Sequence, residues 1–600
     1  MESMFENCSS LYSINLEYMQ TSQVKNMKSM FKGCHLINSL YIEAFDISNV
    51  ETIESMFEGC SSLTQINLNN FNTGKVKNMK SLFSGCSSFS SIDVSNFDTS
   101  KVTNMNSMFS GCLKLTFLSL NNFDTNNVEN MKYIFKGCIV LDYLDISSFV
   151  TSKVINMEGM FFDCASLSEL NLINFDIKST ETMAYMFSGC KILNSLILPD
   201  ISQLSVKNIS HMFSDCSSLN SLDLSNFDSS NVICMDYIFS DCRFLTSLKL
   251  DNIDTQNVFD MKYMFAGCSS LKHINLESIN TQNVKDMNGM FYGCEALLDL
   301  DISKFDTSSV EKMSFMFYHL KSIKSLSIPN FNTSKVEHMN YMFKGCESLT
   351  SLDISEFDVS KIKNFDAMFL GCYKLVTLNI SNFETKNALT MDDMFYDCTS
   401  LKFLDISKFD TSLTTSFKHM FYGCKSLTNL NIMNFDTTLI TSVEYLFYGC
   451  ASLNELSLSN FDTSHVTSFV HMFDGCSNLK SINLENFDTS NVQTMEYMFV
   501  GCSSLININI KTFVTTSLKN MAHMFEGCTS LTTLDLSSFD TSLTENIDNI
   551  FAKDYNLVYV DLRKYDESNM NRMENIFQGT LENMVFCFEK STSKKLYKIH

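Results

Sequence analysis

The sequence predicts an α/β solenoid of about 22 repeat units of 26 residues, with a parallel β-sheet on one face and short helices on the other. Twenty-three phenylalanines stand 26 residues apart, from Phe5 to Phe577, and no insertion or deletion breaks that spacing. A period this strict indicates that every repeat stacks on the next with the same geometry. We refer to these phenylalanines as the ruler phenylalanines.

A short helix is predicted before each ruler phenylalanine. In the repeat of Phe109, the residues Val102, Met105, Met108 and Phe109 fall at i, i+3, i+6 and i+7, which is one face of a helix. Gly111 follows, where a helix ends in the left-handed conformation. The same column holds Gly in 16 repeats and Asn or Asp in others, and these residue types tolerate a positive φ. We expect local strain or a changed turn at the two exceptions, which are His319 and Lys553.

A short strand and a turn are predicted after the glycine. Leu118-Ser119-Leu120 alternates with period two, as a strand with one buried face does. Pro199 and Pro329 both lie 12 residues after their ruler phenylalanines, so the strand is expected to end before that column. The Asp-Thr-Ser segment that follows, as at Asp124-Thr125, is interpreted as turn chemistry because an Asp side chain can accept a nearby backbone N–H.

The domain organisation follows from the period. Residues 1–580 are predicted to form a single solenoid, and residues 581–600 a C-terminal cap or tail, because the glycine and cysteine columns erode around Phe551 and Phe577. Met1 falls on the same column as Met27 and Met79, so the chain starts in the middle of a repeat without an N-terminal cap. We therefore expect the natural start, with any export signal, to lie upstream.

Charge and missing motifs exclude several classes of function. The formal net charge of −23 argues against nucleic acid, which requires basic patches, and against an anionic membrane surface. No signal peptide and no membrane-inserting segment is recognised in this chain. The sequence also has no glycine-rich phosphate loop, no nucleophile elbow and no paired metal motif, which predicts a protein that is not an enzyme and needs no cofactor.

Cysteine forms a column of its own. Twenty of the 22 cysteines stand three residues after a ruler phenylalanine, from Cys8 to Cys528, and no Cys-x-x-Cys spacing suggests a metal site. We interpret the column as a ladder of buried, reduced thiols, because free cysteine is among the most buried residue types. Cys234, near a predicted helix start, and Cys587 stand outside the column and are the candidates for reactive thiols.

The repeat motif resembles a known family. Leu115-x-x-Leu118-x-Leu120-x-x-Phe123 is similar to the core of leucine-rich repeats, with Phe in place of the usual Asn. The fuller string runs Met108-Phe109-Ser110-Gly111-Cys112, then Phe123-Asp124-Thr125, then Val128-Glu129-Asn130-Met131. It resembles the BspA-like leucine-rich-repeat surface proteins, including the repeats of unknown function in mycoplasma-type lipoproteins. The resemblance implies a cell-surface or secreted protein that binds other proteins, often of a host or matrix, in adhesion; it carries over no catalytic residues.

Two columns vary between repeats and are candidate binding surfaces. The position between the two strand apolar residues is expected to face the concave surface and to suit a basic protein patch or a glycan. Its acidic members are Asp93, Asp145, Asp223, Asp301, Asp353 and Asp405, with Asp535 and Asp561 near the end. Two residues before the ruler phenylalanine, serine in the first five repeats gives way to aromatic residues and His from Tyr133 onward. We expect this stripe, with the tyrosines just after the ruler phenylalanine, to form a second, convex contact surface. Its candidates are Tyr292, Tyr318, Tyr341, Tyr396, Tyr422, Tyr445, Tyr448 and Tyr497.

The sequence therefore predicts a binding or adhesion protein, and leaves open an intracellular structural or scaffold protein. A hydrophobic signal or lipobox encoded upstream of Met1 would favour the first, and an in-frame stop there the second.

Overall fold

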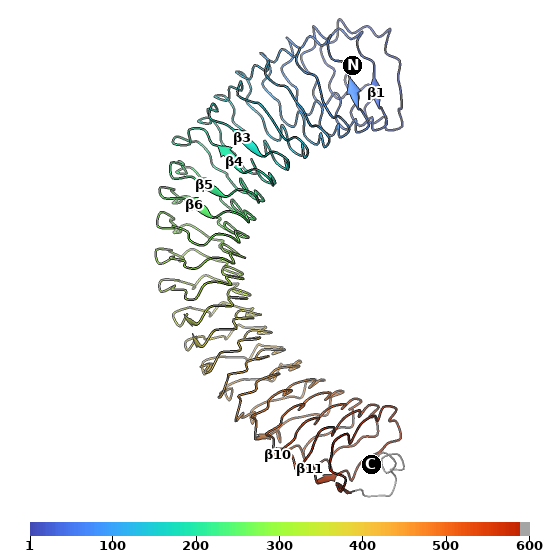
Figure 1. Ribbon diagram of the computed structural model, residues 1–600, viewed down its shortest axis with the longest axis vertical. Helices are drawn as coiled ribbons and strands as arrows, with labels where there is room; N and C mark the ends of the chain where they lie inside the picture. Colours follow the sequence, from blue (N-terminus) through green and yellow to red (C-terminus); the bar gives the residue numbers. More distant parts are fainter. Residues whose placement is uncertain (588–600) are drawn as a thin grey trace. The chain divides into compact units, whose positions relative to one another are not determined.

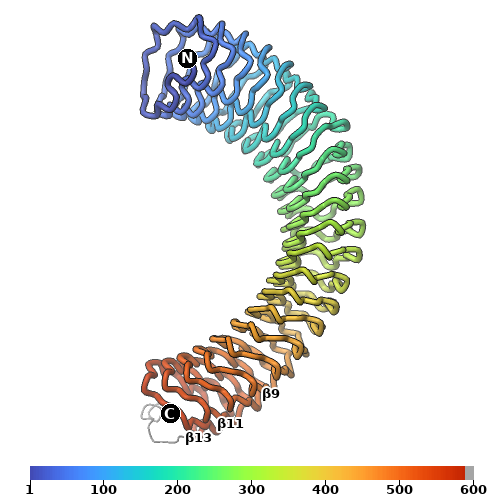
Figure 2. The backbone as a smooth tube through the Cα atoms, turned by 180° about the vertical axis from the view of Figure 1, so that it is seen from behind, coloured from blue at the N-terminus to red at the C-terminus, as the bar shows by residue number. Residues whose placement is uncertain are grey.

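The computed structural model describes residues 1–587, which divide into two compact units, residues 1–297 and residues 298–587. Each unit is a stack of coils in which successive coils run in the same direction (Figures 1 and 2). The register is 26 residues throughout the paired strands: Ser221 pairs with Ser247, and Thr533 with Tyr559. The predicted solenoid with a parallel sheet is confirmed.

Short parallel strands mark one side of the coil. In the N-terminal unit they are β1 (Ser39–Leu40), β2 (Gln65–Ile66), β3 (Glu169–Asn171), β4 (Ser195–Ile197), β5 (Ser221–Asp223) and β6 (Ser247–Lys249), paired as β1–β2, β3–β4 and β5–β6. In the C-terminal unit they are β7 (Ser351–Asp353), β8 (Thr377–Asn379), β9 (Ser481–Asn483), β10 (Asn507–Asn509), β11 (Thr533–Asp535), β12 (Tyr559–Asp561) and β13 (Val585–Cys587), paired as β7–β8, β9–β10 and β11–β12–β13. As expected, β4 ends before Pro199.

The predicted short helices are wrong: residues 1–587 contain none. In the repeat of Phe109, the N–H groups of Met105, Ser107, Phe109 and Gly111 donate to carbonyls of the next coil at 2.6–3.0 Å. The N–H of Met108 donates to the carbonyl of Met105, three residues back, at 3.1 Å. Because alternate N–H groups are used between coils, they cannot form the i→i−4 bonds of a helix. The segment is a run of tight turns that mimics helical spacing.

Residues with a left-handed backbone conformation form these turns. Ser107 has a φ of 56° and Gly111 a φ of 72°, and both columns are left-handed in every coil. The prediction for the glycine column is therefore confirmed. His319 (φ 57°) and Lys553 (φ 64°) keep the same conformation, so the turn does not change there and these side chains bear the strain that glycine avoids.

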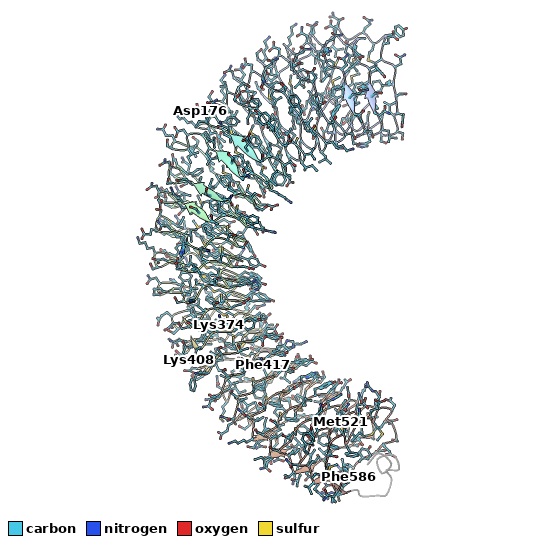
Figure 3. The ribbon with its side chains drawn as sticks, viewed as in Figure 1. Asp176, Lys374, Lys408, Phe417, Met521 and Phe586 are labelled. Atoms are coloured by element: carbon cyan, nitrogen blue, oxygen red, sulfur yellow. The ribbon has the colours of Figure 1, made fainter. Side chains whose placement is uncertain are left out.

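The interior follows the predicted columns. Met105, Met108, Phe109 and Leu115 are fully buried, and the ruler rings stack coil on coil, with 5.9 Å between the centroids of Phe83 and Phe109. Figure 3 shows how side chains fill the coils; its labelled Phe417 and Met521 are both buried. The core is thus one continuous stack within each unit.

The Asp-Thr-Ser turn is confirmed as structural. Asp98 Oδ1 accepts the N–H of Ser100 at 3.0 Å and its hydroxyl at 2.6 Å. Thr99, only 1% exposed, donates its hydroxyl to the carbonyl of Asp124 at 2.9 Å and accepts the N–H of the same residue at 2.8 Å. Each buried threonine hydroxyl therefore joins its coil to the next.

The cysteine column is a buried ladder. Cys60 donates its thiol to the carbonyl of Phe31 at 3.2 Å, and the same contact recurs along the column. Burial raises the pKa of Cys138 to about 12, so these thiols stay protonated. Cys8 is the exception, because it is exposed in the first coil.

The expectation for Cys234 is corrected. It lies in no helix; it takes part in the inter-coil bridges to Asn208 and Asp260 and is half-buried. Burial, aided by Asp236, raises the pKa of Cys234 to about 11, which disfavours the thiolate. Cys587 is half-buried in β13. The strand column thus continues into the segment assigned to the C-terminal cap, whose residues 588–600 lie outside the described part of the chain.

Candidate binding surfaces

The strand face is the surface formed by the outward side chains of the strand column. In β5, Ser221 and Asp223 are exposed and Leu222 between them is 7% exposed, and β7 repeats the pattern. Of the predicted acidic residues, Asp93, Asp223, Asp301, Asp353 and Asp405 are exposed and Asp145 is half-buried. At the end of the column, Asp535 is half-buried and Asp561 is buried. The last position is therefore not on the open face.

These carboxylates have a structural role that sequence reasoning missed. Asp93 Oδ1 accepts the N–H of Ser95 at 3.0 Å, and Asp405 accepts that of Ser407 at the same distance. Asn67 and Asn171 make the same bond, so either residue type closes the turn after the strand. The serine hydroxyl and N–H hold the pKa of Asp93 below its usual value. In Asp93 and Asp405 the turn uses Oδ1, which leaves Oδ2 for a partner, whereas Oδ2 of Asp223 already accepts from Lys249 at 2.9 Å.

Three hollows interrupt the strand face, and each contains one predicted Asp. A hollow of about 300 Å³ spans residues 143–197 and includes Asp145, and another of about 450 Å³ spans residues 325–357 and includes Asp353. The largest, about 760 Å³, spans residues 403–483 and includes Asp405. We call this last one the 403–483 hollow.

The 403–483 hollow lies where the strand ladder is broken. Between β8 and β9, bridges join Thr377 to Phe403 and Asn429 to Glu455, but within the described chain none joins Phe403 to Asn429. Phe403 is 67% exposed and Met433 57% exposed, beside the acidic Asp405 and Glu455. No Lys or Arg lines the hollow. It offers two apolar side chains, two acids and several amide and hydroxyl groups.

The second candidate surface is a ladder of stacked rings. The left-handed column, two residues before the ruler phenylalanine, stacks Tyr445, His471, Tyr497 and His523 with centroids 4.3–4.6 Å apart. The post-Phe column, one residue after it, stacks Tyr396, Tyr422 and Tyr448 at 4.2 and 4.4 Å. The predicted tyrosines are all half-buried. They project from turns and not from the predicted short helices, which are absent from residues 1–587.

Carboxylates accompany the ladder histidines, and sequence reasoning missed these pairs. Nδ1 of His471 lies 2.6 Å from Asp474, that of His523 lies 2.5 Å from Glu526, and that of His419 lies 3.0 Å from Asp393. Two of these pairs, His471 with Asp474 and His523 with Glu526, could have been found in the sequence, because the acid follows the histidine by three residues. Burial lowers the pKa of His211, in the N-terminal unit, although Asp236 opposes that shift.

One cluster has ligand types that could hold a metal ion. A thiol and two carboxylate oxygens, from Cys234, Asp236 and Asp260, lie within 4.8 Å of one another. The ammonium of Lys262 lies 2.7 Å from Asp260 and 3.6 Å from Asp236. The lysine already supplies the positive charge, and the raised pKa of Cys234 disfavours the thiolate that a metal needs. The cluster is best explained as an ion-pair network.

Within residues 1–587 no helical segment reaches the length and apolar character that a membrane crossing requires.

Comparisons with known proteins agree with the repeat architecture. The family model described as "Mycoplasma protein of unknown function, DUF285" matches eight overlapping segments, which are residues 1–118, 90–200, 162–274, 207–328, 298–403, 348–432, 395–503 and 470–586. No curated protein matches the chain.

Solved structures with leucine-rich repeats are among the matches. A leucine-rich repeat protein from Bacteroides ovatus is 18% identical, covering 92% of this chain and 88% of that one, with a TM-score of 0.20. A leucine-rich cell surface protein from Faecalibacterium prausnitzii is 16% identical, covering 72% and 85%, with a TM-score of 0.24. The eight family matches together span residues 1–586 without a gap, so the chain belongs to the DUF285 family of mycoplasma proteins of unknown function.

Proposed function

We propose that the protein is a non-enzymatic, surface-displayed adhesion protein that binds a basic patch of another protein through its strand face. The observation that carries this proposal is the 403–483 hollow, where Asp405 and Glu455 flank the exposed Phe403 and Met433 without a nearby cation in the lining. Exposed aromatic and methionine side chains are enriched where proteins bind one another. The net charge of −23 also favours a basic partner over a second copy of the chain.

The surface location is supported by the resemblance of the repeat motif to BspA-like surface proteins. Protease treatment of intact cells that make the protein tests it, and we expect the chain to be degraded while a cytoplasmic marker survives. Full protection of the chain would instead favour the intracellular scaffold.

The binding site is tested with a panel of basic proteins and neutral glycans against the intact chain. We expect a basic protein to bind, and the double variant Asp405→Asn with Glu455→Gln to weaken that binding about tenfold or more. The matched control is the double variant Asp223→Asn with Glu277→Gln, which removes the same two charges from the N-terminal unit. Asp223 is in the same column but is already paired with Lys249 at 2.9 Å, and Glu277 is exposed. Equal loss in both variants, or binding of glycans alone, would contradict the proposal.

A further inference from the structure

The tyrosine stack of the post-Phe column ends abruptly at Tyr448. Tyr396, Tyr422 and Tyr448 lie nearly parallel, with interplanar angles of 1° and 7°. In the next coil the same column holds Asp474 instead of a ring. Tyr422 therefore covers one face of the Tyr448 ring. On the side of the next coil the column holds the Asp474 carboxylate and no further ring.

At other places in the chain, a lysine ammonium lies over the aromatic ring at this kind of position. Tyr318, in the same column, is followed by Lys344, whose ammonium lies 5.8 Å from the Tyr318 ring centroid and 5.2 Å from that of Tyr341. In the N-terminal unit, Lys136 lies 4.8 Å from Tyr133 and 5.0 Å from Phe162. A cation within about 6 Å of a ring centroid is attracted by the electron-rich face. Lysine thus occupies these positions as a cation–π partner.

Asp474 has the same backbone place as Lys344. The N–H of Gly449 donates to the carbonyl of Asp474 at 2.6 Å, just as the N–H of His319 donates to the carbonyl of Lys344 at 2.7 Å. The Asp474 side chain lies 2.6 Å from His471 Nδ1, and the His471 ring lies 5.8 Å from that of Tyr448. Within residues 1–587 no lysine lies over the Tyr448 ring. At this end of the stack the ring and an acid are present, the acid contacts His471, and no lysine covers the ring as Lys344 covers Tyr318.

We propose that the Tyr448–Asp474 end of the stack binds an arginine or lysine side chain of a partner protein. The cation would stack on Tyr448 as Lys344 does on Tyr318, and it would pair with the Asp474 carboxylate. The ring supplies the cation–π contact and the carboxylate the opposite charge, and a planar guanidinium suits both. None of these residues lines the 403–483 hollow, so this is a second contact that stands apart from the proposed function.

The test uses the intact chain and a peptide of four Arg-Gly repeats, with the affinity measured by calorimetry. Asp474→Lys places a cation where Lys344 stands, and we expect it to fold and to bind the peptide at least about fivefold more weakly. Glu277→Lys, at an exposed residue of the N-terminal unit, makes the same change in net charge and is expected to change the affinity less than twofold. Equal effects of the two substitutions would overturn the proposal.

Two further variants keep the proposal falsifiable. Tyr448→Leu removes the ring but keeps the charge, and it is expected to weaken binding by a similar factor. Lys344→Asp recreates the ring-plus-acid arrangement at Tyr318 and is expected to add a second binding site in the titration. Unchanged binding in Tyr448→Leu, or unchanged stoichiometry in Lys344→Asp, would refute it. Loss confined to the Asp405→Asn and Glu455→Gln variant would mean that the hollow alone binds the peptide.

Discussion

The first five coils and the coils from His419 to His523 have the same backbone but different side chains in the left-handed column. The five serines have φ between 53° and 56°, and the five rings have φ between 54° and 59°. Ser29 and Ser55 are buried, whereas the rings are half-buried and stacked. The inter-coil hydrogen bonds therefore impose the conformation, and the side chain is free to change. Columns in which coils agree build the fold, and columns in which they differ can change side chain without a change of backbone.

The largest effect is expected where the two sets of coils agree. Phe447→Ala removes a fully buried ring from the ruler stack and is expected to cost about 4 kcal/mol of unfolding free energy. Tyr445→Ser, two residues away, converts the left-handed column to the residue of the first five coils and is expected to cost about 1 kcal/mol. Urea unfolding followed by circular dichroism measures both. Similar losses would contradict the distinction between the columns.

A second prediction concerns the coil where the cysteine column fails. Asp554 stands in this column, fully buried, and neither carboxyl oxygen has a hydrogen-bond partner. Burial raises the pKa of Asp554 from 3.8 to about 8. The pKa of Asp554 is higher in the folded chain than in the unfolded chain. The protonated carboxyl therefore stabilises the fold fully below about pH 4, and this stabilisation is lost as the pH rises through about 8. Asp554→Cys is therefore expected to stabilise the chain by about 3 kcal/mol at pH 8.5, and less at pH 6.

Thermal and urea unfolding between pH 6 and 8.5 check this expectation. The control is Asp535→Asn, because hydrogen bonds to Ser537 hold the pKa of Asp535 below 3.8 against the opposing effect of burial. Its removal is therefore expected to cost the same stability at pH 6 and at pH 8.5, and to change the pH dependence only in the acid range. A pH dependence that is unchanged in Asp554→Cys would show that the carboxyl is not buried as described.

The buried threonine column gives the third prediction. Thr99→Val removes the hydroxyl that bonds both backbone groups of Asp124, and it is expected to cost about 2 kcal/mol because those groups lose their partner. Thr99→Ser keeps both bonds, as Ser229 does naturally with Asp254, and should cost about 1 kcal/mol or less. A larger loss for serine than for valine in urea unfolding would contradict the bonding role.

The smallest effect is expected from moving the ring ladder into the first five coils. Ser81→Tyr with Ser107→Tyr places two rings on neighbouring left-handed residues, and we expect unfolding free energy to change by less than about 1 kcal/mol, since stacking offsets the lost serine burial. A new near-ultraviolet circular dichroism signal would report the stacked rings. Unfolding or a loss of several kcal/mol would show that serine is required there.

Much of the fold could be predicted from the repeat itself. The ruler phenylalanines, the cysteine ladder and the left-handed glycine column all have single physical explanations, because only apolar residues fill a stacked core and only a few types tolerate positive φ. The Asp-Thr-Ser turn was also predictable, since Asp and Ser bond locally. The inter-coil role of Thr99 was not, because its partner Asp124 lies 25 residues away.

The candidate surfaces could be predicted only in part. The acidic strand column was visible as a column, but the hollow at 403–483 is formed by side chains of four successive coils, and the repeats there look alike in sequence. In the left-handed column, four positions hold residue types that tolerate a positive φ, namely Gly159, Gly289, Asn549 and Asn575. Most other positions hold Ser, Tyr or His, so the sequence did not indicate a left-handed conformation for the column.

The sequence by itself determined the period, the direction of stacking and the residues of the core. Only the tertiary structure decided that Val102 to Gly111 is a chain of turns and not a helix. A 26-residue coil brings the carbonyls of Asn130, Lys132, Ile134 and Lys136 within 3.0 Å of the N–H groups of the coil before. Those long-range bonds, together with a left-handed residue at Ser107, displace the local bonds of a helix that the apolar spacing equally well predicts.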